Sequence, residues 1–288
     1  MRHCVIKVTV RESDCHLDFC KEPILLMDRW KHFRAQAIIF DKDGTLIDFD
    51  AMWGGWVVYL AEQLQATCGF DVRQPLCLAM GYDAETRKVS PTGKLASRPM
   101  SQLHHLTVEV IQSFGLSRSE AECVVEKAWC IPDPLLLARP LTDMRTLFSK
   151  LYEHGIQIAI ATADDRAPTQ AMIEAFDIEE FITTMVCADD GICSKPAPDM
   201  VLAICERLEL DPKNVMVIGD TASDLRMARA AAAGLAVGVL SGVSSTKDLI
   251  PYADVLIESI DELHTYLLEL DEVKTTRSNP GLDPDFAF

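Results

Sequence analysis

Two aspartates, Asp41 and Asp43, lie one residue apart at the end of an apolar run. The run that precedes them, residues 35–40, ends in Ile-Ile-Phe and predicts a buried strand. Two carboxylates that leave a buried strand together repel each other, and their burial is costly unless a positive charge compensates it. The sequence therefore predicts that a cation, or a group that carries one, binds at this turn.

Four more polar residues follow apolar segments further along the chain: Thr162, Lys195, Asp220 and Asp224. In an open parallel sheet, ligands bind at the carboxyl ends of the strands, so we expect these residues to converge near Asp41. Clustered carboxylates suit Mg²⁺, which prefers oxygen ligands and keeps several of its waters. Lys195 and a loop of backbone N–H groups would hold a second, anionic ligand, for which phosphate is the best fit.

The elements that must position these residues alternate regularly between strand and helix. Repeated units of this kind, with near-continuous apolar strands, predict an α/β fold: a Rossmann-like parallel sheet with helices on both faces. The predicted strands are 35–40, 156–161, 183–187, 215–218, 235–240 and 255–257, and the predicted helices are 143–154, 168–176, 198–208, 222–233 and 261–270.

A helical segment interrupts this alternation after the first strand. Residues 51–138 predict helices at 52–67, 74–80, 99–114 and 117–129, with a loop at 90–99, and form an inserted all-helical cap domain. The core domain then comprises residues 35–50 and 139–270. Residues 1–34 are an N-terminal extension of mixed character, and we expect residues 271–288 to be a disordered tail.

Composition excludes several classes of partner. The 288 residues carry a formal net charge of −17, which disfavours binding to nucleic acid or to an anionic membrane surface. No apolar run is long enough to span a bilayer. The ten cysteines are scattered without a CxxC pair, which is typical of a reducing compartment, and we expect a cytoplasmic protein, either monomer or homodimer.

Four segments match, in order, the motifs of a known family. They are DKDGT at 41–45, Thr162 after a strand, KPAPD at 195–199 and GDTASD at 219–224. With these motifs the chain, from about residue 35 to about residue 257, resembles the haloacid dehalogenase superfamily of phosphohydrolases. The inserted segment resembles the helical cap of phosphoglycolate phosphatases and their relatives.

The resemblance implies a role for each acidic residue. Asp41 would be the nucleophile that forms an aspartyl-phosphate, and Asp43 would be the general acid and base. Mg²⁺ would be held by Asp41, Asp220 and the carbonyl of Asp43. Asp224 would orient the metal site and its waters.

The resemblance also implies a phosphate-binding set. Thr162 and Lys195 would hold the phosphoryl oxygens, and Lys195 would keep Asp41 ionised. Gly44 belongs to the same set, and its lack of a side chain permits the sharp turn after Asp43.

These motifs favour a Mg²⁺-dependent phosphatase that hydrolyses a small phosphorylated metabolite. A phosphomutase would use the same site residues, and a non-catalytic binding protein is a third alternative. A calcium-binding EF-hand does not fit, because Met52 occupies the twelfth position of that loop. The substrate stays open, and Arg87, Lys94 and Arg98 are the cap cations that could meet a second anionic group.

Overall fold

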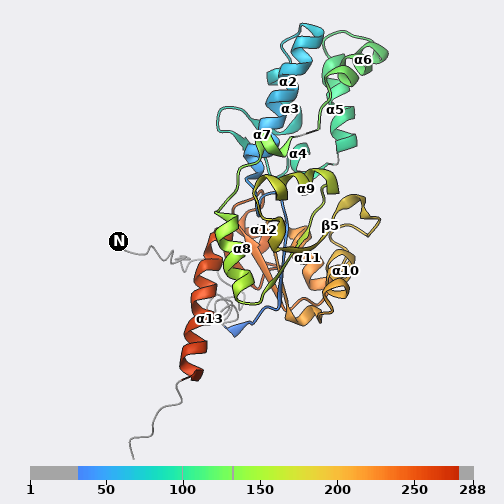
Figure 1. The fold of residues 1–288 in the computed structure, drawn as a ribbon. Coiled ribbons are helices and arrows are strands. Elements are labelled where there is room, and N and C mark those ends of the chain that lie inside the picture. Colours follow the sequence, from blue (N-terminus) through green and yellow to red (C-terminus); the bar gives the residue numbers. More distant parts are fainter. Residues whose placement is uncertain (1–31, 99, 132, 279–288) are drawn as a thin grey trace, which may run out of the picture.

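The computed structural model describes residues 32–98, 100–131 and 133–278, which form two parts (Figure 1). The lower part in this view is a core built around a parallel sheet, and the upper part is a cap of helices. The cap comprises residues inserted after the first strand of the sheet, as the sequence predicts. Within the described residues, no helix is both long and apolar enough to cross a membrane.

The core sheet is parallel throughout, with strand order β5-β4-β1-β6-β7-β8. This order places β1 between β4 and β6, so the strand that leads to Asp41 is paired on both sides. The strands are β1 (Ala37–Phe40), β4 (Gln157–Ala161), β5 (Ile182–Val186), β6 (Val215–Gly219), β7 (Leu235–Val239) and β8 (Val255–Ile257).

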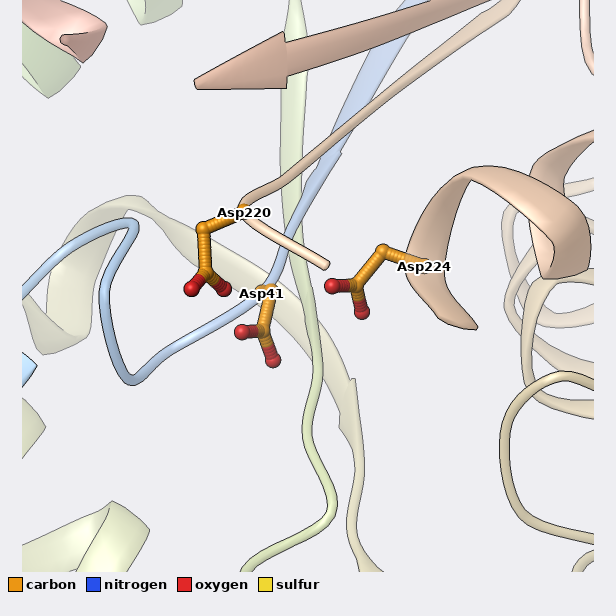
Figure 2. A group of neighbouring side chains, drawn as sticks. All are labelled: Asp41, Asp220 and Asp224. Carbon is orange, nitrogen blue, oxygen red and sulfur yellow. The ribbon is translucent and has the colours of Figure 1, made fainter. Parts of the chain in front are cut away.

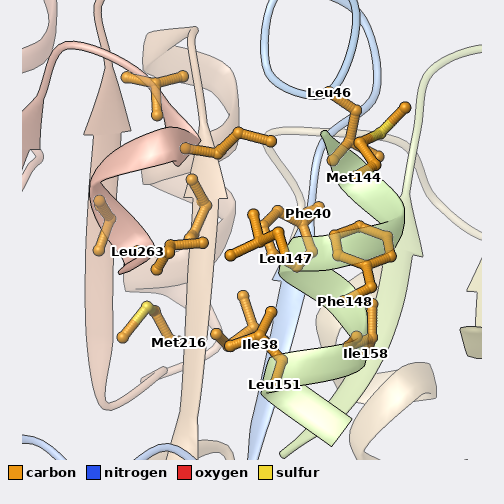
Figure 3. Packing of buried hydrophobic residues seen from close by; sticks show 14 of the residues in the cluster. Ile38, Phe40, Leu46, Met144, Leu147, Phe148, Leu151, Ile158, Met216 and Leu263 are labelled. Atoms are coloured by element: carbon orange, nitrogen blue, oxygen red, sulfur yellow. The ribbon is translucent and has the colours of Figure 1, made fainter. Parts of the chain in front are cut away.

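Alternate residues of β1 pack into two different layers, because successive side chains of a strand point to opposite faces. Ile38 and Phe40 join one hydrophobic cluster with Leu147 and Phe148 (Figure 3). Ala37 and Ile39 join the other cluster, on the opposite face. The central strand is therefore apolar along its whole length, as a doubly covered parallel strand requires.

Helices cover both faces of the sheet and give the core three layers. The cluster that contains Phe40 is completed by α8 (Met144–Glu153), α9 (Arg166–Ala175) and α13 (Leu263–Ser278). The opposite cluster is completed by α10 (Asp199–Leu208), α11 (Ala222–Ala230) and α12 (Thr246–Leu249).

The cap has a hydrophobic core of its own, in which Trp56 is fully buried. The Trp56 ring packs edge-on against the Trp129 ring, with 5.4 Å between the ring centroids. A capping box is present at Ser117, since its side chain accepts from the Glu120 backbone N–H and the Glu120 side chain accepts from the Ser117 backbone N–H. The cap elements are η1 (Asp50–Gly54), α2 (Gly55–Cys68), α3 (Arg73–Met80), β2 (Tyr82–Asp83), β3 (Lys88–Val89), α4 (Lys94–Ser97), α5 (Met100–Gln112), α6 (Arg118–Ala128) and α7 (Pro134–Leu137).

The two chain segments that join cap and core run side by side. Leu141 donates its backbone N–H to Leu46 O (3.0 Å), and Asp48 donates to Arg139 O (2.8 Å). These two bonds flank an antiparallel bridge between Ile47 and Pro140. We call these paired segments the neck.

The structure confirms the predicted α/β sheet and corrects the prediction in three places. The cap is not entirely helical, because β2 and β3 pair as a short antiparallel ladder. The predicted loop at 90–99 contains the helix α4. Helix α13 continues to Ser278, beyond the predicted helix end at residue 270. Residues 1–31 and 279–288 of the two predicted terminal segments lie outside the described residues.

Candidate active site

Three aspartates from separate elements meet at the carboxyl edge of the sheet (Figure 2). Asp41 follows β1, Asp220 follows β6 and Asp224 lies in the first turn of α11. Each offers a carboxylate oxygen, and these oxygens lie within 4.8 Å of one another. The convergence predicted from the strand ends is therefore present for these residues.

Backbone contacts fix Asp41 and Asp220 beside each other. Asp41 donates its backbone N–H to Ile218 O (2.8 Å), which extends the ladder between β1 and β6. Asp220 Oδ2 accepts from the backbone N–H of Val243 (2.9 Å). The loop can approach this closely because residue 242 is glycine: a Cβ there would lie 1.9 Å from Asp220 Oδ2.

Lys195 binds two members of the acidic cluster at once. Its ammonium lies 2.5 Å from Asp41 Oδ1 and 2.6 Å from Asp224 Oδ1. The other oxygen of Asp224 accepts from Thr221, through the backbone N–H at 3.0 Å and the hydroxyl at 2.5 Å, in a capping box that starts α11. Asp224 is thus a member of the cluster, and its carboxylate also orients Lys195.

The cluster carries more negative charge than its surroundings compensate. Burial raises the pKa of Asp41 to about 7, an effect that Lys195 opposes and Asp224 reinforces. Burial also raises the pKa of Asp220 well above its ordinary value, and Asp41 adds to the effect. Three carboxylates face one ammonium, so either protons or a cation must supply the remaining charge.

The donor set fits a divalent cation. Asp220 is 1% exposed, and its Oδ1 has no hydrogen-bond partner among the residues that the structure describes. A buried carboxylate oxygen without a partner is costly unless a ligand binds it. All candidate ligand atoms are oxygens, which suits Mg²⁺.

Asp43 lies in a separate charged group beside this cluster. Its Oδ2 is 3.0 Å from the ammonium of Lys42, which is also 2.9 Å from Asp164 Oδ2. The Lys42 side chain is fully buried; burial opposes its charge, but the two carboxylates outweigh burial and raise its pKa. Asp43 Oδ1 is buried and has no partner among the described residues, so one oxygen of Asp43 is available to a ligand.

The structure separates the predicted phosphate-binding residues. Thr162 and Lys195 line the same cavity as Asp41 and Asp43. Gly44 does not line it, and its backbone N–H donates to Ile47 O (2.7 Å) inside the turn. A part for Gly44 in phosphate binding therefore stays a prediction. Its positive φ of 81° and the close approach of Asp220, 2.5 Å from an added Cβ, explain why glycine is needed.

A cavity of about 630 Å³ lies over the acidic cluster, between core and cap. The core contributes its polar wall and the cap contributes mostly apolar side chains. The lining residues are Asp41, Asp43, Phe49, Trp53, Leu95, Ala96, Arg98, Met100, Thr162, Ala163, Asp164, Ser194, Lys195, Asp220, Thr221, Ser223, Asp224 and Val243.

Four residues of the site were not predicted from the sequence: Lys42, Asp164, Gly242 and Val243. Lys42 could have been noticed, since it lies between the two aspartates that open the site, and Asp164 follows Thr162 by two residues. Gly242 and Val243 belong to a loop after β7 whose sequence gives no sign that it contacts Asp220.

A family model for haloacid dehalogenase-like hydrolases matches residues 35–232. The chain therefore belongs to the haloacid dehalogenase-like hydrolases, and it is an enzyme. Both the matched range and the open parallel sheet with its inserted cap agree with the resemblance seen in the motifs.

Curated relatives in this family include named phosphatases. The chain is 25% identical to the N-acetylmuramic acid 6-phosphate phosphatase of Pseudomonas aeruginosa over 202 residues, which cover 69% of this chain and 79% of that protein. It is 27% identical to the phosphoglycolate phosphatase of Rhodospirillum rubrum over 214 residues, which cover 72% and 79% of the two chains.

Solved structures show the same fold at lower identity. A Thermotoga maritima protein provisionally named a β-phosphoglucomutase superposes with a TM-score of 0.60 at 20% identity, covering 82% of this chain and 99% of its own. A subfamily IA hydrolase of the superfamily from Geobacter sulfurreducens gives a TM-score of 0.53 at 18% identity, covering 81% and 96%.

Proposed function

We propose that this protein is a Mg²⁺-dependent phosphatase that hydrolyses a small phosphomonoester through an aspartyl-phosphate. The observation that carries the proposal is the cavity that unites Asp41, Asp43, Lys195 and the acidic cluster beneath the cap. The names of the curated relatives support a phosphate ester as the substrate.

Asp41 is the nucleophile of the proposed reaction. Its carboxylate attacks phosphorus, an aspartyl-phosphate forms, and the bond between phosphorus and the ester oxygen breaks. Asp43 gives a proton to the departing alkoxide, which leaves as an alcohol. Asp43 then takes a proton from water as that water attacks phosphorus, which releases inorganic phosphate and restores the Asp41 carboxylate and the protonated Asp43.

The remaining residues of the site hold the phosphoryl group and its charge. Lys195, already beside Asp41, and the Thr162 hydroxyl donate to the phosphoryl oxygens as negative charge develops on them. Asp41, Asp220 and the Asp43 carbonyl would hold Mg²⁺, with Asp224 orienting the site. When bound, the cation offsets the charge of the carboxylates and of the phosphate.

The cap would exclude bulk water from this reaction. Its apolar side chains cover the polar wall of the cavity, so a ligand of small size can be enclosed and a large one cannot. This arrangement favours a small metabolite over a phosphoprotein or a nucleic acid as the partner.

The test is phosphate release from a panel of small phosphomonoesters, with Mg²⁺ and after its removal by a chelator. We expect turnover that requires Mg²⁺ and that is lost in Asp41→Asn. Folded protein that releases no phosphate from any ester would refute the proposal, and a phosphorylated isomer as the main product would indicate a mutase.

A further inference from the structure

Among the described residues of the cavity's cap wall, one is charged and its neighbours are apolar. Phe49, Trp53, Leu95 and Met100 are apolar, whereas Arg98 carries a guanidinium group. Among the described lining residues, the other cation is Lys195, which belongs to the core. The two cations therefore lie on the two opposing parts of the molecule that enclose the cavity.

The charge of Arg98 is available to a ligand. Its Nη1 donates to the amide oxygen of Gln102 (3.1 Å), a neutral acceptor, and its side chain is exposed. Within the described part of the chain, no carboxylate forms an ion pair with Arg98. Lys195, in contrast, is held by Asp41 and Asp224.

The other two cap cations do not line this cavity. Lys94 lines a different depression, to which Arg98 also contributes, and is absent from the cavity over the acidic cluster. Arg87 lies in the turn between β2 and β3. The structure thus selects Arg98 from the three cap cations that the sequence offers.

From this placement we propose that Arg98 binds a second anionic group of the substrate. The inference rests on the proposed function, which places the scissile phosphate over Asp41. A guanidinium presents a planar pair of donors that matches a carboxylate or a phosphate. The substrate class is therefore a phosphomonoester with a distal carboxylate or second phosphate and a body that packs against the apolar cap wall.

The size of the cavity supports a body of several carbons. A volume of about 630 Å³ lies in the range of pockets that enclose drug-sized ligands, roughly 300–1,000 Å³. Phosphoglycolate, with a single carbon between its phosphate ester and its carboxylate, would fill only a small part of it.

Two matched substrate pairs test the inference. 6-Phosphogluconate and sorbitol 6-phosphate share a six-carbon chain that ends in a carboxylate or in a hydroxymethyl group. Fructose 1,6-bisphosphate and fructose 6-phosphate differ by a second phosphate. We expect kcat/KM to be about 10- to 100-fold higher for the anionic member of one pair, which is the effect of one charge-assisted hydrogen bond. The pair that shows this preference identifies the second anionic group as a carboxylate or a phosphate.

Arg98→Gln should abolish this preference, whereas the matched control Lys94→Gln should retain it. A preference that survives in Arg98→Gln, or equal kcat/KM within both pairs for the native enzyme, would overturn the inference. Failure of the proposed function gives a different result, namely no phosphate release from any ester. In that case, the affinities for 6-phosphogluconate and for sorbitol 6-phosphate are measured in Asp41→Asn, with and without Arg98→Gln. The comparison of these affinities decides the role of Arg98.

A second inference concerns Lys42 and rests on distances alone. Its ammonium joins Asp43 Oδ2 (3.0 Å) to Asp164 Oδ2 (2.9 Å). Asp164 is itself fixed, since its backbone N–H donates to Thr162 Oγ1 (3.1 Å) and its carbonyl accepts from Ala188 N (2.9 Å). Lys42 thus connects Asp43 to the loop that carries Thr162.

We infer that Lys42 is a positioning residue for Asp43 in the proposed reaction. Without the ammonium, two neighbouring carboxylates would repel each other in a buried place, and the carboxyl group of Asp43 would rotate away from the leaving oxygen. Asp43 would then protonate that oxygen less well, because general acid catalysis requires hydrogen-bond contact.

The dependence on the leaving group distinguishes this role from a merely structural one. In Lys42→Met, kcat/KM for an alkyl phosphate should fall by at least about 10-fold, because an alkoxide needs a proton to leave. The value for p-nitrophenyl phosphate, whose leaving group is stable without a proton, should stay within a few-fold of the native enzyme. Equal losses on both esters, or no loss on either, would refute the inference. An inactive native enzyme would instead refute the proposed function.

Discussion

The buried aspartate cluster predicts that the metal-free protein loses stability as the pH rises. The pKa of Asp41 is raised from 3.8 to about 7, chiefly by burial, so the folded chain binds a proton that the unfolded chain has released. Wherever the folded state binds more protons, stability falls with increasing pH. The stabilising effect of that proton is present below pH 3.8 and is lost as the pH rises through about 7.

The magnitude follows from the pKa difference. Each pKa unit corresponds to about 1.4 kcal/mol, so Asp41 contributes up to about 4 kcal/mol over the full range and about 3 kcal/mol between about pH 5 and pH 7.5. Asp220, whose pKa is also raised, acts in the same direction. Carboxylates with lowered pKa values, such as Asp143 and Asp190, change the free energy of unfolding only at pH values below this range.

Urea unfolding across this pH range, in a chelating buffer, measures the effect. We expect the free energy of unfolding to fall with pH in the native protein and to fall much less in Asp41→Asn, which cannot titrate at this position. Added Mg²⁺ should stabilise the protein more at high pH, because it binds the ionised carboxylates. A metal-free native protein whose stability is constant or rises over the window, or an Asp41→Asn protein with the same slope, would refute the reasoning.

Three further outcomes follow from single contacts. Gly242→Ala should weaken Mg²⁺ binding by about 10- to 100-fold in isothermal titration calorimetry, because the added Cβ would lie 1.9 Å from Asp220 Oδ2. The control is Ser241→Ala, which removes only a hydrogen bond to Gly44 O. Lys195→Met should lower kcat/KM by about 100-fold or more through loss of phosphoryl stabilisation, and near-native rates would count against its role. Tyr266→Phe removes hydrogen bonds to residues 33 and 35 and should cost about 1 kcal/mol of unfolding free energy with kcat/KM unchanged; altered kinetics would contradict this separation.

The sequence predicts the core well because its strands are doubly buried. The runs that form β1 and β6 are apolar on both faces, so they are recognisable without knowledge of their partners. The polar residues that end these strands then converge by topology alone, which is why Asp41 and Asp220 could be placed together.

Contacts that depend on tertiary packing could not be predicted in this way. The Val243 N–H reaches Asp220 from a loop distant in sequence, and Lys42 meets Asp164 only because β1 and β4 are neighbours. The N–H of Gly44 is satisfied inside its own turn, which the motif does not reveal. The end of helix α13 could not be predicted, because residues 271–278 lack the apolar pattern that would indicate a helix.

The neck has a consequence for engineering. Backbone hydrogen bonds at Leu46 and Asp48 hold the two ends of the insert together. For the core, the cap is therefore equivalent to one long loop whose ends are fixed. The entropy of closing a loop grows only with the logarithm of its length, so replacing residues 49–138 by a short turn or a foreign cap changes the loop-closure cost little, provided that the replacement covers the core as Met52 and Ala138 do. In the proposed function, the cap that carries Arg98 is thus a separable module, exchanged at one bridge while β1, which leads to Asp41, is unchanged.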